Sequence, residues 1–220
     1  MLGPLLFRLV VTLTITAAAG GTQVWRHPEF LVFLALEAAW SLVEGYLSRG
    51  GRATATSWQS LNPQQIPFVL SGKWLLLARM GYHIALLGYF GLIGSSTASL
   101  AALPAIAGTT LMLVAIGLRA WSMQTLGERF RGYEVRAEPR GLETGGPYAL
   151  VRHPSYLAIV LFDLGMPLLL NSAWMLPLLV VLLAAMLRRV SAEERLLLTA
   201  YPVDYPVYVA RTRRIVPMIY

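Results

Sequence analysis

Cysteine is absent from this chain, and charged residues are scarce. Without cysteine the chain can form neither a disulfide nor a thiolate-bound metal site, and we expect no metal. Only 13% of its 220 residues are charged, whereas about 25% is usual in soluble domains. Hydrophobic residues make up 56%. This composition excludes an ordinary soluble domain and indicates an integral membrane protein.

The net charge of +7 could suggest a nucleic-acid partner. The basic residues, however, lie between and after apolar runs, which is how membrane topology is encoded. Nucleic-acid binding requires them to form a patch or stripe on one face. We therefore expect the lipid bilayer, and no nucleic acid, as the partner of these charges.

Six apolar runs approach the length of about 20 residues that a membrane-spanning helix needs. They cover residues 5–19, 30–47, 74–93, 100–118, 156–170 and 174–187. The last two are short and are separated by a turn at Asn171-Ser172, which predicts a tight helical hairpin. We expect one all-α membrane domain over residues 1–220. Four membrane helices lie within 1–118, and a C-terminal core within 119–220 adds the hairpin and a cytoplasmic C-terminal helix.

The distribution of Lys and Arg predicts the orientation. If the N-terminus is cytoplasmic, 16 of the 18 Lys and Arg residues fall on cytoplasmic segments, and only Arg26 falls outside. Such an asymmetry predicts that both termini are cytoplasmic. We expect the protein in a bacterial inner membrane or an archaeal plasma membrane.

The most informative segment is the sequence GGPYALVRHPSY at residues 145–156. About 40 residues later come Glu193-Glu194, then Tyr205 and Tyr208, and finally the sequence RIVP at 214–217. Over residues 117–217 this order resembles the isoprenylcysteine carboxyl methyltransferase family and the related membrane phospholipid methyltransferases. Their pattern is G-x-Y-x-x-x-R-H-P-x-Y, a helical hairpin, a Glu pair and a Tyr-rich tail.

The resemblance implies methyl transfer from S-adenosylmethionine by an integral membrane enzyme without a Rossmann pocket. Consistently, no G-x-G-x-x-G opens a helix after a strand. The residues that match the family's cofactor motif are Tyr148, Arg152, His153, Pro154, Tyr156, Glu193 and Glu194. Two positions depart from the family: Ala158 replaces the usual Gly, and Tyr201-Pro202 replaces a frequent Phe-Gly.

These residue types suit the cofactor chemically. Carboxylates accept hydrogen bonds from ribose hydroxyls or an ammonium group, imidazole donates or accepts, and aromatic rings contact adenine or the sulfonium. Each also has a structural interpretation. Pro154 suits a first helical turn, and Arg152 suits a topology signal. The sequence Ser-Ala-Glu-Glu at 191–194 is a capping box, and interfacial tyrosines are common in membrane proteins.

Arg189, four residues before Glu193, is the candidate catalytic residue. The family has a basic residue just ahead of its Glu pair, where an acidic acceptor is held. Arg suits a carboxylate because its planar fork binds both oxygens. Its structural interpretation is a topology anchor beside Arg188.

Ionisable residues inside predicted spans need partners because isolated charges are costly in the membrane. Glu37 and Glu44 share one face of the second span, and Arg79 and His83 share one face of the third. We expect pairing across these two helices. Asp163 should point toward the motif, where it lines the pocket or makes an internal hydrogen bond.

Two further expectations concern the third span. The small residues Gly81, Ala85 and Gly88 form a stripe, which predicts a helix-packing seam. The preceding residues 50–72 are polar with two prolines, and we expect a loop or an interfacial stretch there.

The predicted function is methyl transfer to a lipophilic acceptor that reaches the site from the lipid. The resemblance suggests an isoprenylcysteine carboxylate, while a lipid amine, a thiol or another small amphiphile remains open. One alternative is an NADPH-dependent membrane reductase of the sterol type. Another is a transporter or scaffold that uses Glu37, Glu44, Arg79 and Asp163, although no inverted repeat is visible.

Overall fold

The computed structural model describes residues 25–47, 63, 66–89, 102–127, 141–172 and 175–216, and this part of the chain is all-helical apart from one isolated β-bridge. Its elements are α2 (Pro28–Leu47), α3 (Ile66–Tyr89), α5 (Ala102–Leu126), the 3-10 helix η5 (Gly146–Ala149), α6 (Pro154–Leu169), α7 (Leu178–Ala200) and α8 (Asp204–Arg211). The predicted span at 5–19 lies outside the described residues. The all-α prediction is confirmed.

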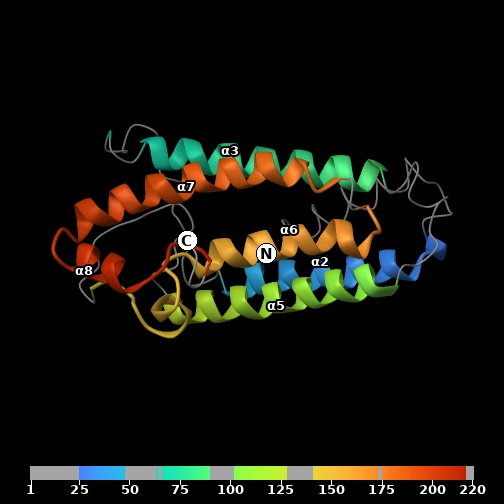
Figure 1. The fold of residues 1–220 in the computed structure, drawn as a ribbon, viewed down its shortest axis with the longest axis horizontal. Helices are drawn as coiled ribbons and strands as arrows, with labels where there is room; N and C mark the ends of the chain where they lie inside the picture. Colours follow the sequence, from blue (N-terminus) through green and yellow to red (C-terminus); the bar gives the residue numbers. More distant parts are fainter. Residues whose placement is uncertain are drawn as a thin grey trace.

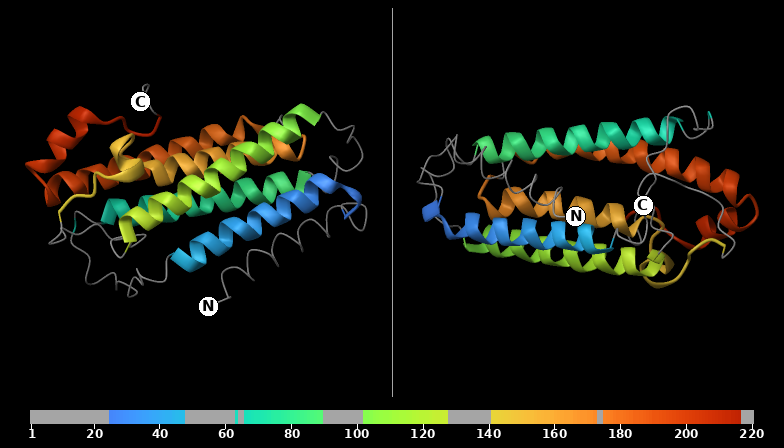
Figure 2. Two further views of the ribbon diagram at one scale, coloured as in Figure 1. Left: turned by 90° about the horizontal axis from the view of Figure 1, so that it is seen from below. Right: turned by 180° about the vertical axis from the view of Figure 1, so that it is seen from behind.

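The long helices form two layers. Helix α7 lies along α3, whereas α6 lies along α5 and α2 (Figure 1). The predicted turn between α6 and α7 is present. Asn171 adopts a left-handed conformation with φ of 48°, and the Ser172 N–H donates to Pro167 O over 2.6 Å. The two helices run antiparallel, as in the hairpin that we predicted, but the hairpin is not tight, because each helix packs mainly on a different neighbour (Figure 2).

Helices α5 and α6 approach closely because two glycines face each other. A Cβ atom added at Gly108 would lie 2.4 Å from Leu169 N, and one added at Gly165 would lie 2.7 Å from Gly108 O. The predicted seam on α3 is absent from the described part of the chain, where Gly81 and Gly88 have open space around them. The close contact therefore uses glycines on different helices, which no pattern within one helix reveals.

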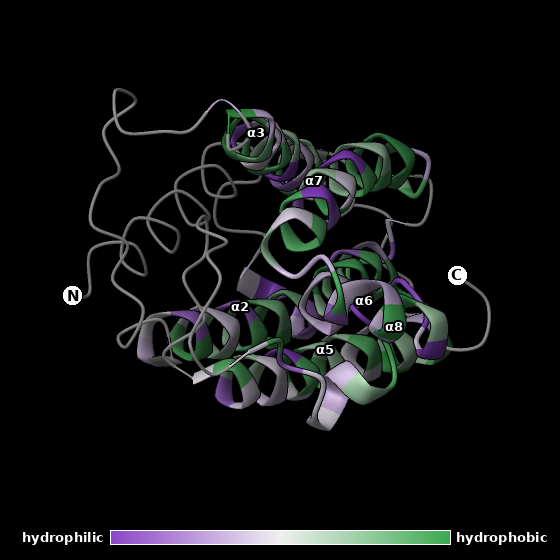
Figure 3. Cartoon of the chain, turned by 90° about the vertical axis from the view of Figure 1, so that its left-hand side faces the viewer, coloured by the Kyte–Doolittle hydropathy of each residue, from purple (hydrophilic) through white to green (hydrophobic). Residues whose placement is uncertain are grey.

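Large apolar side chains cover the outside of the bundle. Among the most exposed are Trp74, Leu103, Ile106, Val180 and Val181, each more than 60% exposed. Helix α5 spans 25 residues and, by length and composition, can cross a membrane. Apolar residues colour both the inner and the outer faces of the helices green in Figure 3. So many exposed large apolar side chains fit contact with lipid rather than with water.

The site-bearing ends of the helices lie together. The N-termini of α3 and α6 and the C-termini of α5 and α7 point to the left in Figure 1, where α8 also lies. We call this the motif end. Three predicted boundaries are corrected there: α3 begins at Ile66, α5 continues to Leu126, and α7 continues through Ser191 to Ala200.

Candidate active site

The motif loop is fixed by the segment that follows α8. The backbone N–H of Arg152 donates to Arg213 O over 2.7 Å, and that of His153 donates to Arg214 O over 3.0 Å. The Tyr208 hydroxyl donates to Tyr148 O over 2.7 Å. Residues about 60 positions apart are thus joined into one site.

Glu194 is held by three basic side chains. Arg152 Nε lies 3.1 Å and His153 Nε2 lies 3.3 Å from Glu194 Oε1, and Arg214 Nη2 lies 2.7 Å from Oε2. Burial alone would raise the pKa of this carboxyl. The hydrogen bond and charge of His153, with Arg214 and Arg152, outweigh burial and lower the pKa to about 2. Glu194 is therefore ionised at neutral pH and presents a fixed negative charge.

Glu193 faces a second set of partners. The Tyr156 hydroxyl donates to Glu193 Oε2 over 2.7 Å and accepts from Arg189 Nε over 3.1 Å. Arg189 is only 2% exposed, and its Nη1 donates to the carbonyl oxygen of Phe68, over whose ring the guanidinium stacks. This chain of contacts connects α6, α7 and α3. Phe68 belongs to the first turn of α3, within residues 50–72, for which we predicted a loop or an interfacial stretch.

The structure brings together six of the predicted site residues: Arg152, His153, Tyr156, Arg189, Glu193 and Glu194. The Glu194 and Glu193 sets form one polar network because the rings of His153 and Tyr156 meet edge to face, with centroids 5.7 Å apart. Pro154 is the first residue of α6, as a proline at a helix start should be. Tyr148 is buried, and burial raises the pKa of its phenol. The predicted capping box is wrong, because Ser191 lies within α7 and its Oγ donates to Leu187 O over 2.8 Å.

Sequence reasoning missed Arg214, which binds both Glu194 and Ser191 Oγ, the latter over 2.7 Å. Arg214 is the first residue of the RIVP sequence in the tail motif. The sequence therefore pointed to Arg214, but we predicted no role for it. It also missed Tyr208, whose side chain is buried against the motif loop. The Tyr-rich tail is therefore part of the site wall.

Asp163 binds α3 rather than the motif. Arg79 Nε lies 3.0 Å from both carboxylate oxygens, His83 Nε2 lies 3.2 Å from Oδ1, and the Tyr82 hydroxyl donates to Asp163 O. Glu44 binds Arg119 Nε of α5 over 2.6 Å. Arg79 also interacts with the charges of Glu37 and Glu44 on α2, as our predicted pairing of α2 with α3 requires. The prediction missed the partners that come from α5 and α6.

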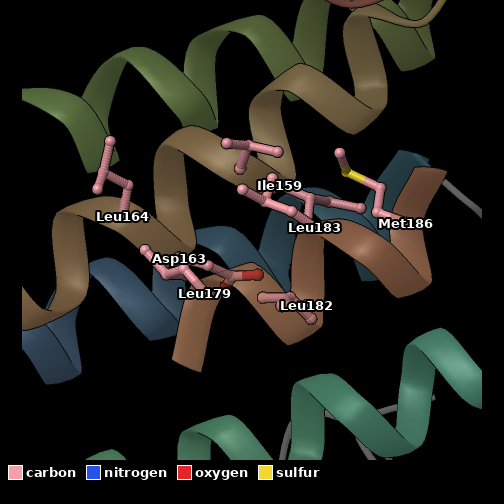
Figure 4. A pocket seen from close by; sticks show the side chains of 8 residues that line it. Ile159, Asp163, Leu164, Leu179, Leu182, Leu183 and Met186 are labelled. Atoms are coloured by element: carbon pink, nitrogen blue, oxygen red, sulfur yellow. The ribbon is translucent and has the colours of Figure 1, made fainter. Parts of the chain in front are cut away.

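A small pocket lies between α6 and α7 (Figure 4). Its volume is about 100 Å³, and seven of its eight lining residues are apolar, the exception being Asp163. Ile159 and Met186 line it, and each is three residues from a member of the polar network, Tyr156 and Arg189 respectively. The pocket therefore begins about one helical turn from the network.

Fold and site together define a helical membrane protein with a polar site at one end of an apolar bundle. Residues 108–199 match the model of the isoprenylcysteine carboxyl methyltransferase (ICMT) family. This match confirms the predicted resemblance to that family, whose members are methyltransferases.

Among solved structures, the chain is similar to the eukaryotic intramembrane Ras methyltransferase ICMT (isoprenylcysteine carboxyl methyltransferase). The TM-score is 0.57 at 20% sequence identity, and the alignment covers 96% of this chain and 74% of that one. At this identity the likeness establishes a shared fold. The comparison with curated proteins gives no match.

Proposed function

We propose that this protein is an integral membrane methyltransferase that uses S-adenosylmethionine and acts on a lipophilic acceptor. The observation that carries the proposal is the polar network at the motif end. In it, residues from the motif loop, α7 and the tail converge on Glu193 and Glu194. Such a convergence of ionisable groups is more typical of a binding site than of helix packing alone.

The residues present fit the methyl donor. Arg152, His153 and Arg214 hold Glu194 in its ionised form, so that it can accept from ribose hydroxyls or an ammonium group. Tyr148 and Tyr156 offer aromatic faces. When bound, the donor supplies an electrophilic methyl group.

The pocket between α6 and α7 supports a lipophilic acceptor. It opens between helices whose outer faces are apolar, and it ends close to Tyr156 and Arg189. An apolar chain in this pocket would place its polar head at the network. We propose that Arg189 positions an acidic head group there, since positioning supplies much of the acceleration of a direct transfer.

Calorimetry on the detergent-purified protein tests the proposal. S-Adenosylhomocysteine should bind to the parent protein, and Glu194→Gln should weaken this binding because the three basic partners lose their anion. NADPH should not bind. Binding of NADPH without S-adenosylhomocysteine would favour a reductase, and binding of neither would favour a transporter or scaffold.

The acceptor requires a separate screen. Lipid extracts are incubated with the protein and a methyl-labelled donor, and labelled products are separated by chromatography. An isoprenylcysteine carrying a free carboxylate serves as a defined probe, with its amide as the matched control. Labelling of the acid but not of the amide would identify the carboxylate as the acceptor group.

A further inference from the structure

The pocket between α6 and α7 runs along both helices and has two distinct ends. Ile159 and Met186 line the end near the polar network, and Leu164 and Leu179 line the far end (Figure 4). The positions of Ile159 and Leu164 in the sequence separate them by roughly 7.5 Å along the axis of α6. The pocket is therefore short and leads away from the network.

The chain itself closes the far end of the pocket. Beyond Leu164 and Leu179, helices α6 and α7 are joined by the turn at Asn171-Ser172. Leu170 and Met175 lie on the two sides of this turn, and each is only 1% exposed. A group that extends along the pocket past the two leucines therefore meets packed side chains and a continuous backbone.

The pocket lining favours a hydrocarbon group, although it includes one acidic residue. Asp163 is fully buried, and Arg79 and His83 of α3 bind both of its carboxylate oxygens. The other seven lining residues are apolar. Burying apolar surface in this lining is favourable, whereas a polar group would lose its hydration without a hydrogen bond in return.

The volume of the pocket limits the size of that hydrocarbon group. The pocket measures about 100 Å³. For comparison, an apolar protein cavity of about 150 Å³ binds benzene, a molecule of six carbon atoms. By this measure the pocket holds about five carbon atoms, which corresponds to one isoprene unit. A tail of two or three isoprene units exceeds this volume.

We propose that the methyl acceptor carries a short apolar tail of about one isoprene unit, and that Leu164 and Leu179 set this length limit. This inference rests on the proposed function, in which the head group of the acceptor lies at the polar network. The pocket begins about one helical turn from Tyr156 and Arg189. An acceptor with its head group at these residues therefore places the first carbon atoms of its tail in the pocket.

Acceptors with one head group and tails of increasing length test the limit. N-Acetylcysteines with an S-dimethylallyl, S-geranyl or S-farnesyl group carry one, two and three isoprene units. Methyl transfer from labelled S-adenosylmethionine is measured with the full-length protein, at equal mole fractions of acceptor in the detergent micelles. The kcat/KM should be highest for the dimethylallyl compound and about 10- to 100-fold lower for the other two, because longer tails overpack the pocket.

Shortening the side chains at the far end should lengthen the accepted tail. Leu179→Ala should raise the ratio of kcat/KM for geranyl to that for dimethylallyl by about 10-fold or more, since each additional buried methylene contributes roughly a factor of four. Differences in micelle partitioning cancel when this ratio is compared between variant and parent. Leu164→Ala, at a half-buried position that tolerates truncation better, should act in the same direction.

Val180→Ala is the matched control, because Val180 follows Leu179 on α7 but is 66% exposed and does not line the pocket. Its ratio should equal that of the parent. A parent that prefers farnesyl, or an unchanged ratio in both leucine variants, would overturn the length limit. Binding of S-adenosylhomocysteine without methylation of any compound in the series would also overturn it, while leaving the proposed use of the donor intact. Failure of the parent to bind S-adenosylhomocysteine would instead refute the proposed function.

Discussion

The Tyr156 hydroxyl donates a 2.7 Å hydrogen bond to Glu193 Oε2, and this contact joins α6 to α7 across the two layers of the bundle. Asp163 makes a second connection between the layers through Arg79 of α3. The two connections lie seven residues apart on α6, with the apolar pocket beside them. They can therefore be tested separately with the same chemical change.

Tyr156→Phe should weaken S-adenosylhomocysteine binding by about 1–3 kcal/mol, because Glu193 and Arg189 both lose a buried partner. Tyr82→Phe removes the hydrogen bond to Asp163 O instead and should lower thermal stability without changing affinity. Calorimetry and thermal unfolding in detergent measure the two effects. Equal affinities of Tyr156→Phe and the parent would exclude Tyr156 from the binding site.

Acid should destabilise the site through Glu194. Its partners lower the pKa from 4.5 to about 2, so the folded state holds the proton less tightly than the unfolded state. The resulting stabilisation is present above pH 4.5 and is lost as the pH falls toward 2. Thermal unfolding between these limits should show the loss, and Glu194→Gln should reduce the slope. A parallel decline in the variant would assign the effect to other groups.

Arg189→Lys should slow methyl transfer on the order of 100-fold, because Lys keeps the charge but cannot reproduce the planar fork. S-Adenosylhomocysteine affinity should change much less than the rate. Arg188→Lys, at an exposed neighbour on the same helix, is the control and should leave the rate unchanged. Unchanged rates in both Arg189→Lys and Arg189→Gln would show that Arg189 only helps to orient the protein in the membrane.

Gly108→Ala should destabilise the bundle by about 1–3 kcal/mol, because the new methyl group meets the backbone of α6, which cannot move aside locally. Gly117→Ala lies on the same helix with nothing within 4 Å of the added atom. It should be neutral or slightly stabilising, since Ala has the better helix propensity. Thermal unfolding of both variants in one detergent gives the comparison. Equal midpoints would show that α5 and α6 are not in backbone contact.

Cysteine labelling tests the orientation that we propose. The chain has no native cysteine, so Ala102→Cys and Ala210→Cys, both exposed, report on opposite ends of the bundle. In intact cells Ala102→Cys should react with a membrane-impermeant maleimide, and Ala210→Cys should react only after permeabilisation. The reverse pattern would invert the topology.

Much of the helical framework follows from local patterns. The apolar runs identified α2, α3, α5, α6 and α7, because an apolar stretch of this length has few other stable forms in a membrane. The boundaries at the motif end were less predictable. Charged residues such as Arg119 and Arg189 continue the helices there, since their partners come from other helices and lie far away in the sequence.

The candidate site was predictable as a set of residues but not as a geometry. The motif identified His153, Tyr156 and the Glu pair. It could not show that Glu193 and Glu194 face different partners, which depends on the orientation of α7 toward both α3 and α6. Arg214 escaped assignment for the same reason, because its role depends on the tail returning to the motif loop.

The walls of the pocket between α6 and α7 belong to different layers of the bundle. A molecule that enters the pocket would therefore push the two layers apart. Two contacts between the layers oppose this separation. One is the hydrogen bond between Tyr156 and Glu193, and the other is the ion pair between Asp163 and Arg79. Under the proposed function, a bulky acceptor tail in the pocket would strain the hydrogen bond of the Tyr156 hydroxyl to Glu193. Acceptor shape would then affect binding of the methyl donor.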